Sequence, residues 1–234
     1  MGYGHSLYQS NRTYTVHRYK NRAEWLKGRQ DLHGIGGSDA SSVLGLNPWR
    51  TNLQLWRIKT GREEAPDISG KSYVQYGSEE EKHLRAKFQR MFGKEYAVEY
   101  MNDVILQNNE HPEMLYSPDG LLIDNEGRRG ILEIKTTNVM SSRDKEKWYD
   151  WHTKQESLPD NYYVQVLHGL NVTGFTFVKL YAELIYPDKS SWLIVRSVER
   201  EEVEDDLKTI KDGIIEFWRQ VEEDEEPGQI INDI

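Results

Sequence analysis

The sequence contains no cysteine among its 234 residues. Without a thiol, the chain can form no disulfide, thiolate zinc site, iron–sulfur cluster or cysteine nucleophile. It also lacks an apolar run near the roughly 20 residues that a membrane-spanning helix requires, and its first residues lack the apolar segment of a secretory signal. We therefore expect a cytoplasmic protein that does not contact a membrane.

The composition is that of a folded protein with unevenly distributed charge. Hydrophobic residues make up 37% and aromatic residues 11%, which is enough to fill a core. The formal net charge is −9, but residues 201–234 hold 13 acidic and 3 basic residues, so the remainder carries about +1. We expect a single domain over 1–234, with a core at about 20–200 and an acidic C-terminal helix at 200–226 that faces solvent.

Hydrophobic periodicity and turn residues predict a mixed α/β fold. The last predicted helix carries one apolar face, which we expect to pack against the sheet. Turn residues 125–127 separate two short strands and predict a hairpin. Predicted helices cover 21–30, 40–44, 51–60, 78–92, 162–170 and 203–221, and predicted strands lie within 96–124, 130–136, 175–186 and 192–198. The fold class is therefore α/β, with a central mixed sheet flanked by helices.

The predicted hairpin carries an acidic pattern, Pro118-Asp119 followed by Glu133-Ile134-Lys135. Hydrolysis of phosphodiesters with Mg²⁺ requires hard oxygen ligands and a nearby cation. Residues i and i+2 of a strand share one face, so Glu133 and Lys135 lie together, and the hairpin brings Asp119 towards them. The carbonyl of Ile134 is a further oxygen ligand in this arrangement. The alternative is a solvated strand face with an ordinary Glu–Lys pair.

Two similar patterns elsewhere do not fit this geometry. Residues 80–82 and 206–208 also read acidic-x-Lys, but both lie in predicted helices, where i and i+2 point about 200° apart.

Glu81 and Gln165 are further candidates for the same site. Glu81 shares a helical stripe with Leu84 and Phe88, and a carboxylate on an apolar stripe is costly unless it is paired or bound to a metal. The alternative is a capping box with Ser78 as the N-cap residue. Gln165 lies in the first turns of the helix that Asn161 is expected to cap.

A glycine-rich turn, Gly34-Ile35-Gly36-Gly37-Ser38, precedes a predicted short helix. Ser38 or Asp39 is expected to cap that helix, and its free N–H groups favour an anion. Arg29, a few residues upstream, is suited to grip a phosphate. The alternative is a tight turn with an ordinary cap. The turn is not a P-loop, because it lacks Gly-Lys-Ser/Thr.

Taken together, these motifs resemble the YqaJ-type viral recombinase family, which is related to lambda exonuclease within the PD-(D/E)xK nuclease superfamily. The resemblance runs from about Trp25 to Gln165. It rests on Trp25-x-x-x-Arg29, GIGGSDASSVLGLNPW, Tyr76-Gly77 leading to Glu81, Ser117-Pro118-Asp119-Gly120, Glu133-Ile134-Lys135 and Tyr162-x-x-Gln165.

The resemblance implies a restriction-endonuclease-like fold and Mg²⁺-dependent 5′→3′ degradation of one strand of linear double-stranded DNA, with one or two ions and with Mn²⁺ as a substitute. Asp119, Glu133, Glu81 and the Ile134 carbonyl would hold the metal. Lys135 would orient the attacking water, and Gln165 would complete the shell. Arg29, Ser38, Trp25 and Ser117 would lie at the phosphate or DNA contact.

Relatives in this family form ring-shaped homotrimers and work with a single-strand annealing protein in recombination. The resemblance therefore implies a homotrimer and an annealing protein as partner. Two other functions stay open at this point. One is an endonuclease or nickase built on the same metal site, and the other is a non-catalytic module that binds DNA ends or a partner protein.

Overall fold

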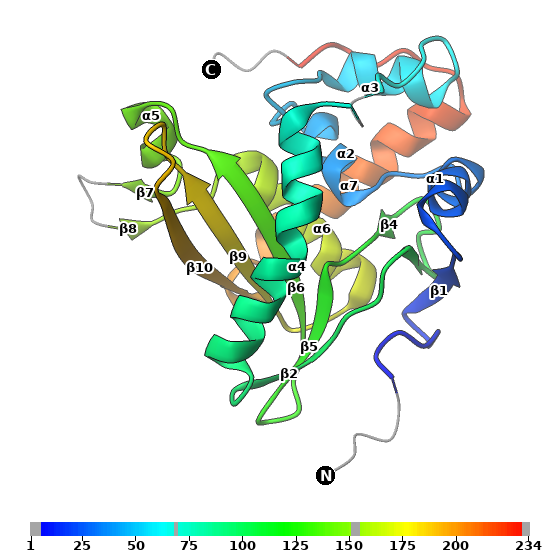
Figure 1. The fold of residues 1–234 in the computed structure, drawn as a ribbon. Coiled ribbons are helices and arrows are strands. Elements are labelled where there is room, and N and C mark those ends of the chain that lie inside the picture. The colour runs from blue at the N-terminus through cyan, green and yellow to red at the C-terminus, as the bar shows by residue number, and fades with distance from the viewer. Residues whose placement is uncertain (1–5, 68–69, 151–154, 231–234) are drawn as a thin grey trace.

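The computed structural model describes residues 6–67, 70–150 and 155–230. Its main sheet has the strand order β10–β9–β6–β5–β2 (Figure 1). β6 and β9 run parallel, and the other neighbours are antiparallel. The strands are β2 (Tyr96–Glu99), β5 (Gly120–Asp124), β6 (Arg129–Asn138), β9 (Phe177–Ile185) and β10 (Ser191–Glu199). The expected mixed central sheet is therefore present.

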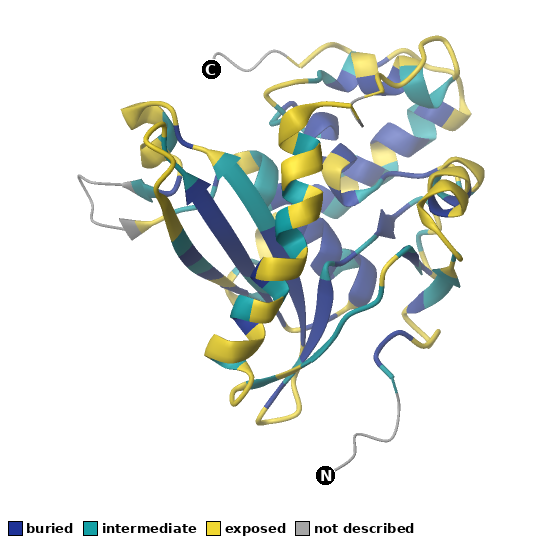
Figure 2. Cartoon of the chain, viewed as in Figure 1, coloured by how far each residue is buried: buried dark blue, intermediate teal, exposed yellow. Residues whose placement is uncertain are grey.

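One face of this sheet is covered by the long helix α4 (Ser72–Phe92). Leu84 and Phe88 are fully buried in a cluster that includes Leu122, Leu132 and Ile134. The outer side of α4 is exposed, whereas β6 and β9 are largely buried (Figure 2). The helix therefore lies directly over the strand that carries Glu133 and Lys135.

The opposite face packs against α6 (Asp160–Thr173), with α2 (Gly37–Val43) and α7 (Glu204–Glu222) beside it. The sequence predicts that the last helix packs on the sheet, and this is wrong. The apolar side of α7 packs mainly against α6 and α2 instead, because α6 already occupies the sheet face. The acidic side chains of α7 are exposed, as predicted.

The remaining elements frame this core. A second sheet joins β1 (Tyr14–Arg18), β3 (Val104–Asn108) and β4 (Leu115–Tyr116), of which β1 was not predicted. None of the described helices is both long and apolar enough to span a bilayer. The other elements are α1 (Arg22–Asp31), α3 (Asn52–Lys59), α5 (Ser142–Glu146), β7 (Tyr149–Asp150), β8 (Gln155–Glu156) and the 3₁₀ turn η1 (Arg200–Glu202).

Local structure confirms the hairpin but corrects three predicted helix starts. β5 and β6 form the predicted hairpin around Gly127, whose φ is +82°.

The starts of three helices differ from the prediction. α4 begins at Ser72, so Ser78 lies inside the helix and caps nothing. α6 follows Pro159, which places Asn161 in its first turn. α2 has Gly36 at its N-cap, so neither Ser38 nor Asp39 occupies that position.

Candidate active site

The β5–β6 hairpin brings Asp119 and Ile134 together where its ladder ends. The last backbone pair of the ladder joins Gly120 to Leu132. Beyond that pair, Oδ2 of Asp119 accepts a hydrogen bond from the Ile134 N–H at 2.7 Å. The N–H and C=O of one strand residue point to the same edge, so the Ile134 carbonyl also faces the Asp119 side.

Glu133 is the buried centre of the site, with 2% of its surface exposed. Its Oε1 lies 2.7 Å from Nζ of Lys135 and accepts a hydrogen bond from Nε2 of Gln165 at 2.5 Å. Its Oε2 accepts a hydrogen bond from the hydroxyl of Tyr116 at 2.5 Å. Three donors, from β6, α6 and β4, thus hold one carboxylate. Such partners compensate the free-energy cost of burying a carboxylate.

The charges of this site are unbalanced around Asp119. Burial raises the pKa of Asp119 well above its usual range, the charge of Glu133 raises it further, and Lys135 only partly opposes this. Burial lowers the pKa of Lys135, but the charges of Glu133 and Asp119 outweigh burial and raise that pKa overall. Lys135 is therefore a fixed ammonium beside two carboxylates that repel each other.

Glu81 approaches the site from α4. Its charge contributes to the raised pKa of Asp119. Its carboxylate forms an ion pair with Arg85, one turn along the helix. Because Ser78 lies within the helix, the capping-box interpretation of Glu81 is wrong. The Nε atom of Arg85 is buried and has no hydrogen-bond partner among the described residues, whereas its Nη1 donates to Asn102.

The donor set fits a hard divalent cation. Asp119 and Glu133 supply carboxylate oxygens and Ile134 a carbonyl, the ligand type that Mg²⁺ prefers. Burial, and after it the charge of Glu133, raises the pKa of Asp119, and a bound cation would stabilise its carboxylate. Within 6–67, 70–150 and 155–230, however, no group of three acidic or histidine side chains is arranged to coordinate one metal ion. Glu81 is paired with Arg85 instead, and its role as a ligand stays a prediction.

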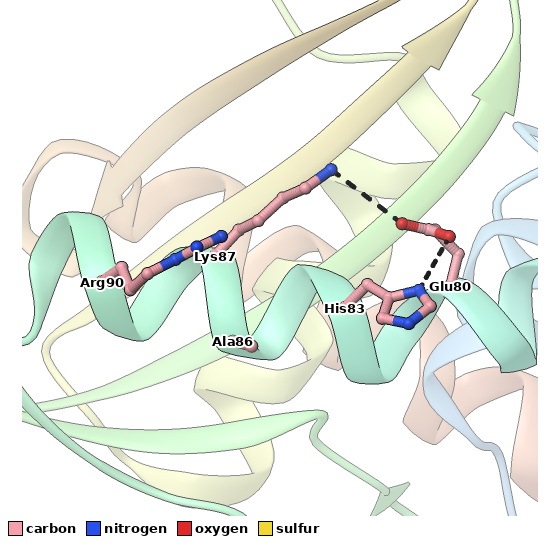
Figure 3. A pocket seen from close by; sticks show the side chains of 5 residues that line it. All are labelled: Glu80, His83, Ala86, Lys87 and Arg90. Atoms are coloured by element: carbon pink, nitrogen blue, oxygen red, sulfur yellow. Dashed lines mark hydrogen bonds and ion pairs between the residues drawn. The ribbon is translucent and has the colours of Figure 1, made fainter.

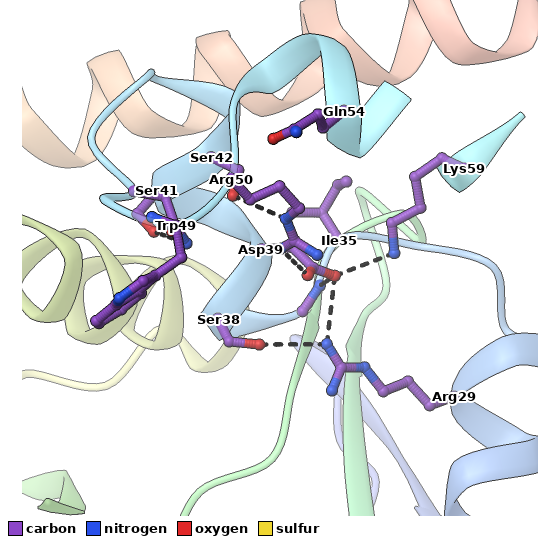
Figure 4. Close-up of polar contacts among 12 residues, drawn as sticks. Arg29, Ile35, Ser38, Asp39, Ser41, Ser42, Trp49, Arg50, Gln54 and Lys59 are labelled. Atoms are coloured by element: carbon purple, nitrogen blue, oxygen red, sulfur yellow. Dashed lines mark hydrogen bonds and ion pairs between the residues drawn. The ribbon is translucent and has the colours of Figure 1, made fainter. Parts of the chain in front are cut away.

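A second polar cluster lies at the glycine-rich turn, where three cations surround Asp39 (Figure 4). Nη2 of Arg50 lies 2.6 Å from Oδ1 of Asp39, and Nζ of Lys59 lies 3.0 Å from Oδ2. Nη2 of Arg29 lies 3.3 Å from the same Oδ2 and donates a hydrogen bond to the Ser38 hydroxyl, also at 3.3 Å. Three positive charges around one negative charge leave an excess that favours an anion.

Asp39 is almost fully buried, and the cations keep it ionised. Burial opposes the charged form, but Lys59, Arg29 and Arg50 outweigh burial and hold the pKa of Asp39 below its usual range. A Cβ at Gly36 would lie 3.0 Å from Nη2 of Arg29, so a glycine at this position lets the guanidinium approach the turn closely. The sequence singled out Arg29 and Ser38 but missed Arg50 and Lys59 as partners of Asp39.

Trp25 and Ser117, which were also predicted to contact phosphate or DNA, lie outside the cluster around Asp39. Trp25 is buried, and its indole N–H donates to the carbonyl of Val104 at 3.2 Å. The DNA contact of Trp25 stays a prediction. The ring supports Arg29, whose guanidinium carbon lies 5.7 Å from the ring centroid. Ser117 is half-buried between β4 and Asp119, and its DNA contact stays a prediction.

His168 links the two clusters, although sequence reasoning did not identify it. Its Nε2 lies 2.9 Å from the carbonyl of Leu115 and 3.1 Å from that of Ile35. Both partners are acceptors, so Nε2 carries the proton. Burial lowers the pKa of His168 to about 4, which keeps the ring neutral at pH 7. The glycine-rich turn is thereby joined to β4, the strand that carries Tyr116.

A shallow groove lies along α4 and is lined by residues outside both clusters (Figure 3). Lys87 extends across it, with Nζ 4.0 Å from a carboxylate oxygen of Glu80 and 3.9 Å from one of Glu183. None of the predicted site residues lines this groove. The lining residues are Glu80, His83, Ala86, Lys87 and Arg90.

Solved structures with this fold are known. The alkaline exonuclease LHK-Exo from Laribacter hongkongensis matches with a TM-score of 0.55 and 17% sequence identity, covering 86% of this chain and 94% of that chain. LHK-Exo in complex with dAMP matches with a TM-score of 0.56 and 16% identity. At these identities the likeness concerns the fold alone, and it confirms the predicted restriction-endonuclease-like arrangement of a mixed sheet flanked by helices.

Sequence relatives identify the family. The uncharacterized protein YqaJ from Bacillus subtilis (strain 168) is 35% identical over 199 residues, which is 85% of this chain. The chain spans only 56% of that relative's length. The model of the YqaJ-like viral recombinase domain matches residues 24–176, a range that includes every candidate residue from Trp25 to Gln165. The chain therefore belongs to the YqaJ-like viral recombinase family.

Proposed function

We propose that this protein is a divalent-metal-dependent exonuclease that degrades one strand of linear double-stranded DNA from its 5′ end. The observation that carries the proposal is the meeting of Asp119, Glu133, Lys135 and Gln165 where the β5–β6 ladder ends. Family membership supports a role in recombination. Mg²⁺ is the proposed ion, with Mn²⁺ as a substitute, because the donors are hard oxygens.

Different residues of the site have different roles in the proposed reaction. Asp119, Glu133 and the Ile134 carbonyl would hold the cation, which when bound would activate water and offset charge on the phosphate. Lys135 places a positive charge beside the reacting phosphate and stabilises negative charge that develops on its oxygens. Gln165 orients Glu133 through its amide N–H. Buried Tyr116 keeps the other oxygen of Glu133 from turning away.

The cluster around Asp39 supports recognition of a 5′-terminal phosphate. Arg29 is the cation there with the longest contact to Asp39, and it is also the most exposed of the three. It is therefore the guanidinium best placed to turn towards a substrate phosphate, with the Ser38 hydroxyl beside it. A pocket for the 5′ phosphate next to the carboxylates gives the reaction its direction.

Assembly and partners are also part of the proposal. The resemblance to the family supports a homotrimer around duplex DNA and a single-strand annealing protein as partner. The exposed acidic side of α7 is unsuited to a DNA-lining surface, because duplex DNA is a dense polyanion, so α7 would face away from the channel.

Incubation of 5′-phosphorylated linear duplex with Mg²⁺ tests the proposal. We expect a 5′-terminal label to be released as mononucleotide before a 3′-terminal label, and we expect no release of either label with EDTA. The Glu133→Gln variant, which changes one buried atom, is the matched control and should be inactive. Release from the 3′ end first would contradict the proposed direction.

Two further substrates separate the remaining functions. A covalently closed circular duplex should stay uncut, and nicking of that circle would indicate an endonuclease instead. Linear duplex that is bound but stays intact with both Mg²⁺ and Mn²⁺ would indicate a non-catalytic module that binds DNA ends.

A further inference from the structure

Tyr116 lies between the two polar clusters, and neither acidic pattern of the sequence includes it. It is the last residue of β4 and is 1% exposed. Its hydroxyl donates to Oε2 of Glu133. A phenylalanine would fill the same space, but a buried hydroxyl costs free energy unless it is bonded. The hydroxyl therefore has one evident partner, the central carboxylate of the site.

Two glycines hold the Tyr116 ring between α2 and α6. A Cβ added at Gly37 would lie 2.9 Å from the ring, and one added at Gly169 would lie 2.6 Å from it. Both distances are shorter than real Cβ contacts, so the ring rests directly on the backbone of both helices. Tyr116 therefore cannot shift without moving α2 or α6.

Gly37 ties this contact to the cluster around Asp39. It is the first residue of α2, next to Ser38, whose hydroxyl accepts from Arg29. The same added Cβ at Gly37 would lie 3.2 Å from Cγ of Gln165, the second side chain that donates to Glu133. The glycine-rich turn thus touches both neutral donors that hold the carboxylate.

We propose that Tyr116 is a positioning residue that fixes the Glu133 carboxylate and transmits the position of the glycine-rich turn to it. Through this contact, the seating of a DNA end beside Arg29 and the orientation of Glu133 depend on each other. The inference rests on the proposed function and adds a residue for the same reaction.

Tyr116→Phe isolates the hydroxyl, and Tyr14→Phe is its matched control. Tyr14 is equally buried, and its hydroxyl donates to the Leu7 carbonyl at 2.8 Å, away from the site. A hydrogen bond to a charged group contributes enough for a roughly tenfold effect on rate. We expect Tyr116→Phe to lower kcat roughly tenfold while KM for DNA ends changes less than about twofold. Tyr14→Phe should lower thermal stability but leave kcat unchanged.

A double-mutant cycle tests the transmission step. Gly37→Ala should lower kcat in the wild-type background, because the added methyl group displaces the Tyr116 ring. In the Tyr116→Phe background, the same substitution should lower kcat by less than about threefold, since the bond from Tyr116 to Glu133 is already lost and only the longer 3.2 Å contact with Gln165 is left to disturb. Multiplicative effects in the double variant would overturn the transmission step.

Binding of Mn²⁺ alone, measured by titration calorimetry without DNA, gives a readout independent of turnover. We expect Tyr116→Phe to weaken it several-fold and Tyr14→Phe to leave it unchanged. If the wild type is active but Tyr116→Phe retains its kcat and Mn²⁺ affinity, this inference fails and the proposed function stands. If the wild type leaves linear duplex intact, the proposed function itself fails.

Discussion

Lys135 and Glu133 lie side by side on one face of β6, with 2.7 Å between Nζ and Oε1. Glu133 is buried, with 2% of its surface exposed, whereas the Lys135 side chain is 20% exposed. Breaking a buried ion pair is far costlier than breaking a surface pair, because the remaining charge is left without compensation. We therefore expect the pair to contribute to the stability of the fold as well as to catalysis.

Lys135→Met should destabilise the fold by about 2–4 kcal/mol and abolish cleavage, because it leaves Glu133 buried without its cation. Urea unfolding and nuclease assays measure the two effects. Lys87→Met is the control, since the Lys87 side chain is 34% exposed and lies 3.9–4.0 Å from its acidic partners, so its loss should cost less than about 1 kcal/mol. Equal losses of stability in both variants would contradict a special contribution from the Lys135–Glu133 pair.

Asp119→Asn should make the metal-free protein more stable while abolishing cleavage. Because the pKa of Asp119 is raised in the folded state, stability falls as pH rises through that pKa. The amide removes the repulsion from Glu133, and we expect a gain of about 1 kcal/mol in EDTA at neutral pH. Thermal unfolding should then show that Mg²⁺ stabilises the wild type but not the variant. A variant less stable than the wild type in EDTA would count against repulsion at this site.

Asp39→Asn should cost about 2–4 kcal/mol of stability, because three cations lose their shared counter-charge. Arg29→Ala should cost less than about 1 kcal/mol, since its contact is the longest and its side chain is partly exposed. Arg29→Ala should also slow digestion of 5′-phosphorylated ends more than that of 5′-hydroxyl ends. Equal slowing on both substrates would argue against a phosphate pocket.

His168 should make the fold sensitive to mild acid. Its pKa is about 4 in the folded state and about 6.5 in the unfolded chain. Between these values the unfolded chain binds more protons, so stability falls as pH drops from about 6.5 to about 4, by about 3 kcal/mol in total. His168→Gln keeps an N–H donor but cannot titrate. Urea unfolding at several pH values should give a flatter pH dependence for this variant, and an unchanged slope would rule out His168 as the cause.

Local patterns in the sequence predicted the part of the site that lies on the hairpin. Strand alternation places Glu133 and Lys135 on one face, and the turn at Gly127 brings Asp119 back to them, so both follow from short-range rules. Turn residues and apolar periodicity likewise predicted the sheet with its flanking helices.

Contacts between residues that are far apart in the sequence could not be predicted in the same way. Arg50 and Lys59 lie 11 and 20 residues from Asp39, and no periodicity connects them with it. The start of α4 was missed because Gly77, an expected boundary, lies inside the helix and packs near Thr136 of β6. The partner of α7 was missed because an apolar stripe shows that a face is buried but does not identify what covers it.

The hairpin also has a consequence for the order of folding. Asp119 and Ile134 are only 15 residues apart, so a short loop closure joins them, whereas pairing of β6 with β9 must wait for the long connection through α6. Because Lys135 is carried by the same strand as Glu133, the two acidic groups meet with a neutralising ammonium already beside them. The nascent chain can thus bring these two mutually repelling carboxylates together early, before the helices enclose them.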